Sequence, residues 1–118
     1  MSGQVLPEAK EIVAEFVERV TQRFGDRIRQ IIFFGSRAAG RPKPGSDYDL
    51  LLVVREKDRD LIDQLYDEVL DVLLKYGVDL SLKIYTEKAF QTGLASRVPF
   101  LGSVTETGVE LWNVRRKS

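Results

Sequence analysis

Two apolar segments joined by a loop rich in glycine and proline constrain the fold more than any other feature of the chain. The apolar run in residues 28–34 predicts a central strand that is covered on both faces. Residues 47–54 open polar and end in an apolar run, which predicts a second strand. Between them, the segment from Gly40 to Ser46 holds two prolines and two glycines, which exclude regular structure. Because this connection is too short for a crossover helix, we expect the two strands to be antiparallel.

Apolar residues at helical spacing predict a long helix before this strand pair and another after it. The first should run over residues 7–24 and stop at Gly25, and the second should run over residues 57–76 and stop at Gly77. The predicted buried stripe of the second helix consists of Leu61, Ile62, Leu65, Val69, Leu70 and Leu73.

Alternating residues predict a third strand over 78–85, with one core face and one polar face. The predicted core face carries Leu80, Leu82 and Ile84, and the polar face carries Asp79, Ser81, Lys83 and Tyr85. Short helices over 87–96 and 99–107, an edge strand over 109–114 and a frayed tail over 115–117 should follow.

This order of elements predicts an α/β (α+β) fold in which helices pack on a small mixed sheet. A length of 118 residues favours a single domain over 1–118. The formal net charge of zero disfavours bulk nucleic-acid binding, which normally needs a basic excess. We find no signal peptide and no apolar run near the ~20 residues that span a bilayer. We therefore expect a cytoplasmic protein without membrane association.

The chain contains neither cysteine nor histidine, which excludes thiolate nucleophiles, zinc sites built on these residues and every triad that uses imidazole. A metal ion would have to bind oxygen ligands, which favours Mg²⁺ or Mn²⁺. A general base would have to be Asp, Glu, Lys or Tyr.

Two carboxylates open the second apolar strand. Asp47 and Asp49 are two residues apart, so both side chains leave the same face of the strand. Carboxylates this close repel each other unless they share a cation, and this pair suits Mg²⁺. The competing interpretation is a turn, because Gly-Ser-Asp is common in loops.

Gly35 and Ser36 directly follow the first apolar strand. Glycine permits close approach, serine adds a hydroxyl, and backbone amides at a helix start favour an anion, which together favour a phosphate site. An ordinary turn after a strand explains the same pair in isolation. A phosphate site at the end of one strand and a carboxylate pair at the start of the next form the layout that binds a nucleoside triphosphate with metal ions.

These motifs resemble those of the minimal nucleotidyltransferases in the DNA polymerase beta-like superfamily, including their MntA-like antitoxin type. The resemblance rests on Gly-Ser-Arg-Ala-Ala-Gly at 35–40 and Ser-Asp-Tyr-Asp-Leu-Leu at 46–51, with ten residues between Ser36 and Asp47. It covers most of the chain, including the Gly-Val-Glu-Leu-Trp ending at 108–112. One departure is Ala39, where the family often has arginine.

The resemblance implies transfer of a nucleoside monophosphate with release of pyrophosphate. Asp47, Asp49 and Asp79 would be both the catalytic and the metal-binding residues, with Mg²⁺ or Mn²⁺ as cofactor and ATP as the default nucleotide. Gly35 and Ser36 would hold the triphosphate, and the cations that can reach phosphate are Arg37 and Lys83.

This chain has no room for the second domain with which larger relatives bind the acceptor. The resemblance therefore implies a protein partner, either a HEPN-type toxin whose antitoxin this chain would be or a substrate-binding subunit. Homo-oligomers are compatible with the sequence. The alternative is a binding module that neutralises its partner by contact alone, without catalysis.

Overall fold

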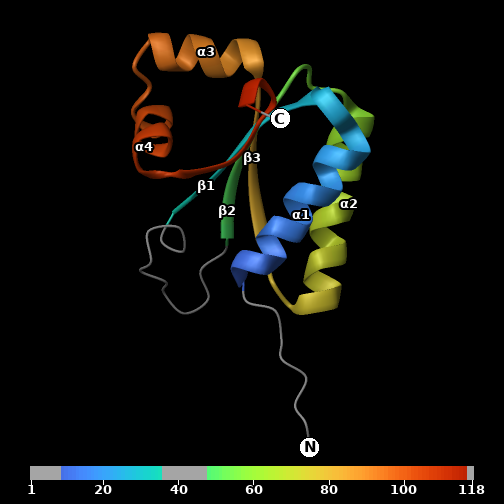
Figure 1. Cartoon of the computed structure of the whole chain (residues 1–118). Helices are drawn as coiled ribbons and strands as arrows, with labels where there is room; N and C mark the ends of the chain where they lie inside the picture. Colours follow the sequence, from blue (N-terminus) through green and yellow to red (C-terminus); the bar gives the residue numbers. More distant parts are fainter. Residues whose placement is uncertain (1–8, 36–47, 117–118) are drawn as a thin grey trace, which may run out of the picture.

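The computed structural model describes residues 9–35 and 48–116. Two long helices, four strands and two short helices make up this part of the chain (Figure 1). In chain order they are α1 (Ala9–Phe24), β1 (Ile28–Phe34), β2 (Tyr48–Val54), α2 (Arg59–Tyr76), β3 (Leu80–Thr86), α3 (Glu87–Ala95), α4 (Pro99–Thr107) and β4 (Val109–Asn113). Single 3₁₀ turns follow α1 (Gly25–Arg27) and β4 (Val114–Arg116).

The described strands form one mixed sheet in the order β3-β2-β1-β4. Strand β1 is antiparallel to both β2 and β4, whereas β2 and β3 are parallel. The mixed sheet and the antiparallel β1–β2 pair confirm the predictions from the sequence. In the β1–β2 register Phe34 lies opposite Asp49, so the end of β1 meets the start of β2.

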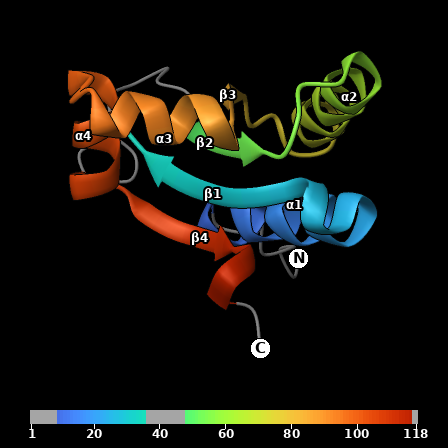
Figure 2. The same cartoon turned by 90° about the horizontal axis from the view of Figure 1, so that it is seen from above.

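Helices cover both faces of the sheet, and a separate core cluster lies on each face. Helices α1 and α2 pack side by side on one face, and α3 and α4 lie on the other (Figures 1 and 2). Beneath α1 and α2, the large cluster includes Phe16, Leu50, Leu52 and Leu65. The smaller cluster beneath α3 and α4 consists of Ile32, Leu51, Val53, Phe90, Leu101 and Val104.

Local capping interactions set the bounds of the helices. The Asp58 side chain accepts a hydrogen bond from the Asp60 amide, so α2 begins at Arg59 instead of the predicted residue 57. Gly77 ends α2 in the left-handed conformation with φ +71°, as predicted. The Ala89 amide donates a hydrogen bond to the Thr86 side chain, so α3 begins at Glu87, the predicted start.

The buried face of α2 differs from the predicted stripe. Leu70 and Leu73 are 49% and 40% exposed, and Ile62 is only partly buried. Val72 and Glu68 are buried in their place. The physical reason is Glu68, whose carboxylate pairs with two arginines of α1 and turns its side of α2 toward that helix.

Two other boundaries also differ from the predictions. Strand β3 begins at Leu80, two residues later than predicted, so Asp79 directly precedes the strand. At the other end, Arg115 and Arg116 belong to a 3₁₀ turn and are not frayed. The start predicted for the first helix at Pro7 lies outside the described residues, as does Lys117. Among the described helices, none has the length and apolar character needed to cross a membrane.

Candidate active site at one edge of the sheet

The topology of the sheet gathers the end of β1 and the starts of β2 and β3 at one edge. Asp49 lies opposite Phe34 of β1 on one side and opposite Ser81 of β3 on the other. The Tyr48 amide donates a hydrogen bond to the Asp79 carbonyl oxygen at 3.1 Å, which places Asp79 beside the start of β2. We call Gly35, Asp49 and Asp79 the acid edge.

Gly35 lies directly against the carboxylate of Asp49. Its φ of +89° is a conformation that side chains other than glycine rarely adopt. A Cβ atom built at this position would collide with Oδ2 of Asp49. Glycine therefore allows the backbone after β1 to approach the Asp49 carboxylate, a contact that the sequence analysis did not predict.

The side chain of Asp49 leaves the sheet on the side of α3 and α4. Leu50 and Leu52 belong to the cluster under α1 and α2, so the alternate residues Asp49 and Leu51 face the other way. Ser81 and Lys83 leave β3 on this same face, because Leu80 and Leu82 point into the large cluster. The exposed Lys83 lies opposite Leu51, about 7 Å along the strand from Ser81.

The structure thus brings together part of the predicted site. Gly35 adjoins Asp49 at the acid edge, the Asp79 backbone lies beside the start of β2, and Lys83 is further along the face from which Asp49 projects. Ser36, Arg37 and Asp47 lie outside the described residues. Over residues 9–35 and 48–116, no group of three metal-ligating side chains occurs, and the predicted metal site needs Asp47 in addition. The carboxylate oxygens of Asp49 and Asp79 are ligands that fit Mg²⁺ or Mn²⁺.

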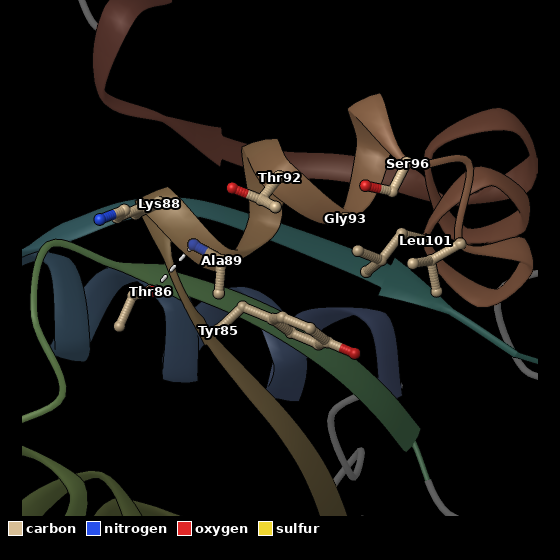
Figure 3. Close-up of a pocket in the computed structure, with 9 residues that line it drawn as sticks. Tyr85, Thr86, Lys88, Ala89, Thr92, Gly93, Ser96 and Leu101 are labelled. Atoms are coloured by element: carbon tan, nitrogen blue, oxygen red, sulfur yellow. Dashed lines mark hydrogen bonds between the residues drawn. The ribbon is translucent and has the colours of Figure 1, made fainter.

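A hollow beside α3 is a further feature of this sheet face, and the sequence reasoning missed it. It has a volume of about 580 Å³ and is lined by Tyr85, Thr86, Lys88, Ala89, Thr92, Gly93, Ser96, Val98 and Leu101. Figure 3 shows Tyr85 beneath α3, while Thr92 comes from the helix itself and Ser96 directly follows its last residue. The available signal was Tyr85, which extends the polar row of β3 to this position.

The one buried charge among the described residues, Glu68, lies away from the acid edge. Burial alone would raise the pKa of its carboxyl, but hydrogen bonds and charges from Arg19 and Arg23 outweigh burial and hold that pKa below its ordinary value. Nε of Arg19 and Nη1 of Arg23 each lie 2.8 Å from a carboxylate oxygen. This network joins α1 to α2 and has a structural role.

Comparison with known sequences identifies the family of the chain. The family model of the nucleotidyltransferase domain matches residues 13–100. Three relatives from Methanocaldococcus jannaschii have the provisional name protein adenylyltransferase. The first is 38% identical over 73 residues, which are 59% of this chain and only half of that relative. The second is 36% identical over 69% of this chain and 77% of its own length. The third is 31% identical over 88% of this chain and 99% of its own length.

Solved structures share the fold at low sequence identity. A toxin–antitoxin structure with AMP-PNP aligns with a TM-score of 0.57 at 18% identity, covering 85% of this chain and 73% of the other. The complex of a tri-AMPylated HEPN toxin with its MNT antitoxin from Shewanella oneidensis aligns with a TM-score of 0.51 at 13% identity, over 91% and 75%. A nucleotidyltransferase structure from Sulfolobus solfataricus aligns with a TM-score of 0.50 at 21% identity, over 90% and 81%.

These structures confirm the nucleotidyltransferase fold predicted from the motifs. The family implies a nucleotide substrate, and its match extends over the end of β1, the start of β2 and all of β3. The acid edge therefore lies within the segment that defines the family. The chain therefore belongs to the nucleotidyltransferase domain family.

Proposed function

We propose that this protein transfers AMP from ATP to a hydroxyl group of a partner protein, with Mg²⁺ as cofactor. The observation that carries the proposal is the acid edge, where Gly35 adjoins the Asp49 carboxylate and Asp79 lies beside the start of β2. Two further observations support it, namely the family of the chain and the relatives that are named protein adenylyltransferases.

The proposed roles follow the chemistry of each side chain. Asp47, Asp49 and Asp79 would hold Mg²⁺, or Mn²⁺ in its place, which supplies stabilisation of negative charge on the phosphates. Gly35 and Ser36 would orient the triphosphate, and Arg37 and Lys83 would neutralise part of its charge. Because Asp47 and Asp49 are two residues apart in the sequence, a shared cation would relieve their repulsion.

The transfer forms one bond and breaks one. The acceptor oxygen bonds to the α-phosphorus of ATP, and the bond from that phosphorus to the oxygen bridging to the β-phosphorus breaks. Pyrophosphate leaves with that bridging oxygen, and the hydroxyl proton passes to a base. Asp79 is our candidate for this base. It is exposed, and it lies beside the start of β2 and directly before β3.

For the acceptor, we propose a HEPN-type toxin in the cytoplasm, with this chain as its antitoxin. The support is the fold shared with toxin–antitoxin structures, one of which contains a tri-AMPylated HEPN toxin. A separate substrate-binding subunit would satisfy the same need for a positioned hydroxyl. The match to this chain covers half the length of one relative and nearly all of another.

A labelling assay tests the proposal. The protein is incubated with α-labelled ATP, Mg²⁺ and the purified HEPN protein encoded beside it, or with a cell lysate if no such neighbour exists. We expect label on a protein and a loss of about a hundredfold or more in Asp49→Asn. The matched control is Asp67→Asn, which removes an exposed carboxylate from α2 on the opposite side of the sheet and should label normally.

Two results would contradict the proposal. Equal labelling by Asp49→Asn would show that the acid edge is not the reaction centre. Neutralisation of the toxin by unlabelled, folded Asp49→Asn protein would favour the module that acts by contact alone. Circular dichroism and thermal melting of each variant separate these outcomes from loss of folding.

A further inference from the structure

Exposed apolar side chains gather where α3 turns into α4. Leu94, Val98 and Phe100 are 36%, 39% and 37% exposed, and the cationic Arg97 lies among them. We call these four residues the α3–α4 corner. The corner adjoins the hollow of about 580 Å³ in Figure 3, because Val98 lines that hollow together with Ser96 and Leu101.

An aromatic pair connects this corner to the acid edge. The rings of Phe34 and Phe100 meet edge to face, with centroids 5.4 Å apart and an interplanar angle of 78°. Phe34 lies directly opposite Asp49, and both side chains leave the sheet on the side of α3 and α4. Opposed residues on one face have Cβ atoms about 4.5–5.5 Å apart, so Phe100 is one side chain away from the Asp49 carboxylate.

Arg97 occupies a backbone position that normally favours glycine. Its φ is +58°, and it is the one residue other than glycine with positive φ among those described. The Val98 amide donates to the Gly93 carbonyl oxygen at 2.9 Å, and the Arg97 amide donates to the Leu94 carbonyl oxygen at 3.0 Å. These two bonds define a Schellman helix ending, in which Arg97 takes the left-handed position. The folded protein is less stable with arginine at this position than it would be with glycine.

The charge of Arg97 is available to a ligand. Its side chain is exposed, and within the described residues it forms no ion pair. Lys88, which lines the hollow, also forms no ion pair with any of the described residues. The surface beside the acid edge therefore combines an apolar floor, the hydroxyls of Thr92 and Ser96, and two cations that no carboxylate of this part of the chain neutralises.

We infer that the α3–α4 corner binds the acceptor polypeptide and selects an apolar residue and an acidic residue beside the acceptor hydroxyl. The apolar side chain enters the hollow, the acidic side chain pairs with Arg97, and the hydroxyl then lies at the acid edge. This inference rests on the proposed transfer to a protein. A peptide fits better than a second nucleotide, because Asp49 and Asp79 already mark the phosphate end of the site and the corner offers a wide apolar surface.

Three tyrosine peptides of equal length test the inference. Each has leucine beside the tyrosine, and the next position is glutamate, glutamine or lysine. Binding is measured by fluorescence anisotropy without nucleotide, and labelling is then measured with α-labelled ATP. We expect the wild-type protein to bind the glutamate peptide about two- to five-fold tighter than the lysine peptide, the range of an exposed ion pair. Labelling should follow the same order.

Charge reversal provides the decisive variant. Arg97→Glu should reverse the ranking of the peptides, whereas Arg59→Glu, at the start of α2 beneath the other sheet face, should keep the wild-type ranking. Arg97→Gly should lose the ranking and raise the melting temperature by about 2–4 °C, since the strained position is relieved. A loss of preference together with a gain in stability is not the result of a damaged fold.

The outcomes separate this inference from the proposed function. If peptide ranking survives in Asp49→Asn but no variant ever labels a protein, the corner binds polypeptide while the proposed transfer fails. If labelling occurs but the peptides rank equally, or Arg97→Glu ranks them as the wild type does, the inference is wrong and the transfer stands. A third result would also overturn the inference. If ATP displaces the peptide from the wild-type protein and Arg97→Glu abolishes this displacement, the corner binds the nucleotide.

Discussion

At the scale of single residues, Gly35 is where backbone conformation and the acid edge depend on each other. We predict that Gly35→Ala loses stability by about 1–2 kcal/mol, because a φ of +89° strains a residue with a Cβ atom. The added methyl group also displaces the Asp49 carboxylate, and misplacement by about 1 Å costs on the order of a hundredfold in rate. Urea denaturation and the labelling assay measure the two effects.

A second glycine provides the matched control for this residue-scale prediction. Gly77 also has positive φ, at +71°, but a Cβ atom built there has nothing within 4 Å. Gly77→Ala should therefore lose stability without losing labelling at a temperature where the protein is folded. If both alanine variants lose activity equally, strain alone explains the effect and the contact with Asp49 is unimportant.

Residue-scale prediction from the sequence is possible where the chemistry is local. Gly35, Asp49 and Asp79 were recognisable because short motifs place glycine and carboxylates at strand ends, and the topology then brings those ends together. Arg97 was not predictable, since its left-handed conformation follows from how α3 ends and α4 begins. The aromatic contact between Phe34 and Phe100 joins residues far apart in the sequence, so no local pattern contains it.

At the scale of elements, strands and helix ends were more predictable than helix faces. Capping residues such as Thr86 and Gly77 act through adjacent backbone groups, so their positions set the ends directly. Helix α2 is apolar over a broad part of its circumference, and the apolar pattern therefore permits several rotations about its axis. The partners of Glu68 on α1 select one rotation and leave Leu70 and Leu74 exposed.

The Glu68 network predicts how the α1–α2 layer responds to acid. Because the pKa of Glu68 is lowered in the folded state, its contribution is present above the ordinary value of 4.5 and is lost as pH falls through the folded value. We expect the melting temperature of the wild-type protein to fall below pH 4.5 more steeply than that of Glu68→Gln. At neutral pH this variant should be less stable by about 1–3 kcal/mol, since a buried charged acceptor is lost.

Asp71→Asn controls for surface charge in the same layer. Asp71 also approaches Arg19, but at 4.0 Å and with its side chain 65% exposed, so its removal should change neutral-pH stability little. Thermal melts from neutral pH to about pH 3 compare the three proteins. Parallel curves for Glu68→Gln and the wild type would mean that protonation of the buried carboxylate is not coupled to unfolding.

At the scale of the whole molecule, the sheet separates a large core cluster from a small one. The order of elements predicted helices packed on a small mixed sheet, but the unequal sizes of the clusters depend on side chains meeting across the sheet. The α1–α2 side holds most of the buried apolar residues described, whereas the α3–α4 side holds six. The acceptor surface that we propose is therefore carried by the layer with the smaller core.

This asymmetry predicts the order in which the molecule opens. In native-state hydrogen exchange, amides of α3 and α4 should exchange through a local opening of lower free energy than amides of β1 and β2, because opening free energy follows buried contact. Leu101 and Leu65 are both buried, one in each cluster, and provide a matched pair of alanine substitutions. Each substitution should lower, by about 2–5 kcal/mol, the free energy of the opening that exposes its own cluster.

Leu101→Ala should lower the opening free energy of α3 and α4 first and leave exchange from α1 governed by global unfolding. Leu65→Ala should instead lower protection throughout the sheet and in α1 and α2. Equal loss of protection everywhere in both variants would show that the molecule unfolds as one cooperative unit. If the α3–α4 layer does open separately, the corner can adjust to an acceptor while β1 and β2 hold Asp49 in place. The proposed acceptor recognition would then belong to the α3–α4 layer and the proposed catalysis to the sheet.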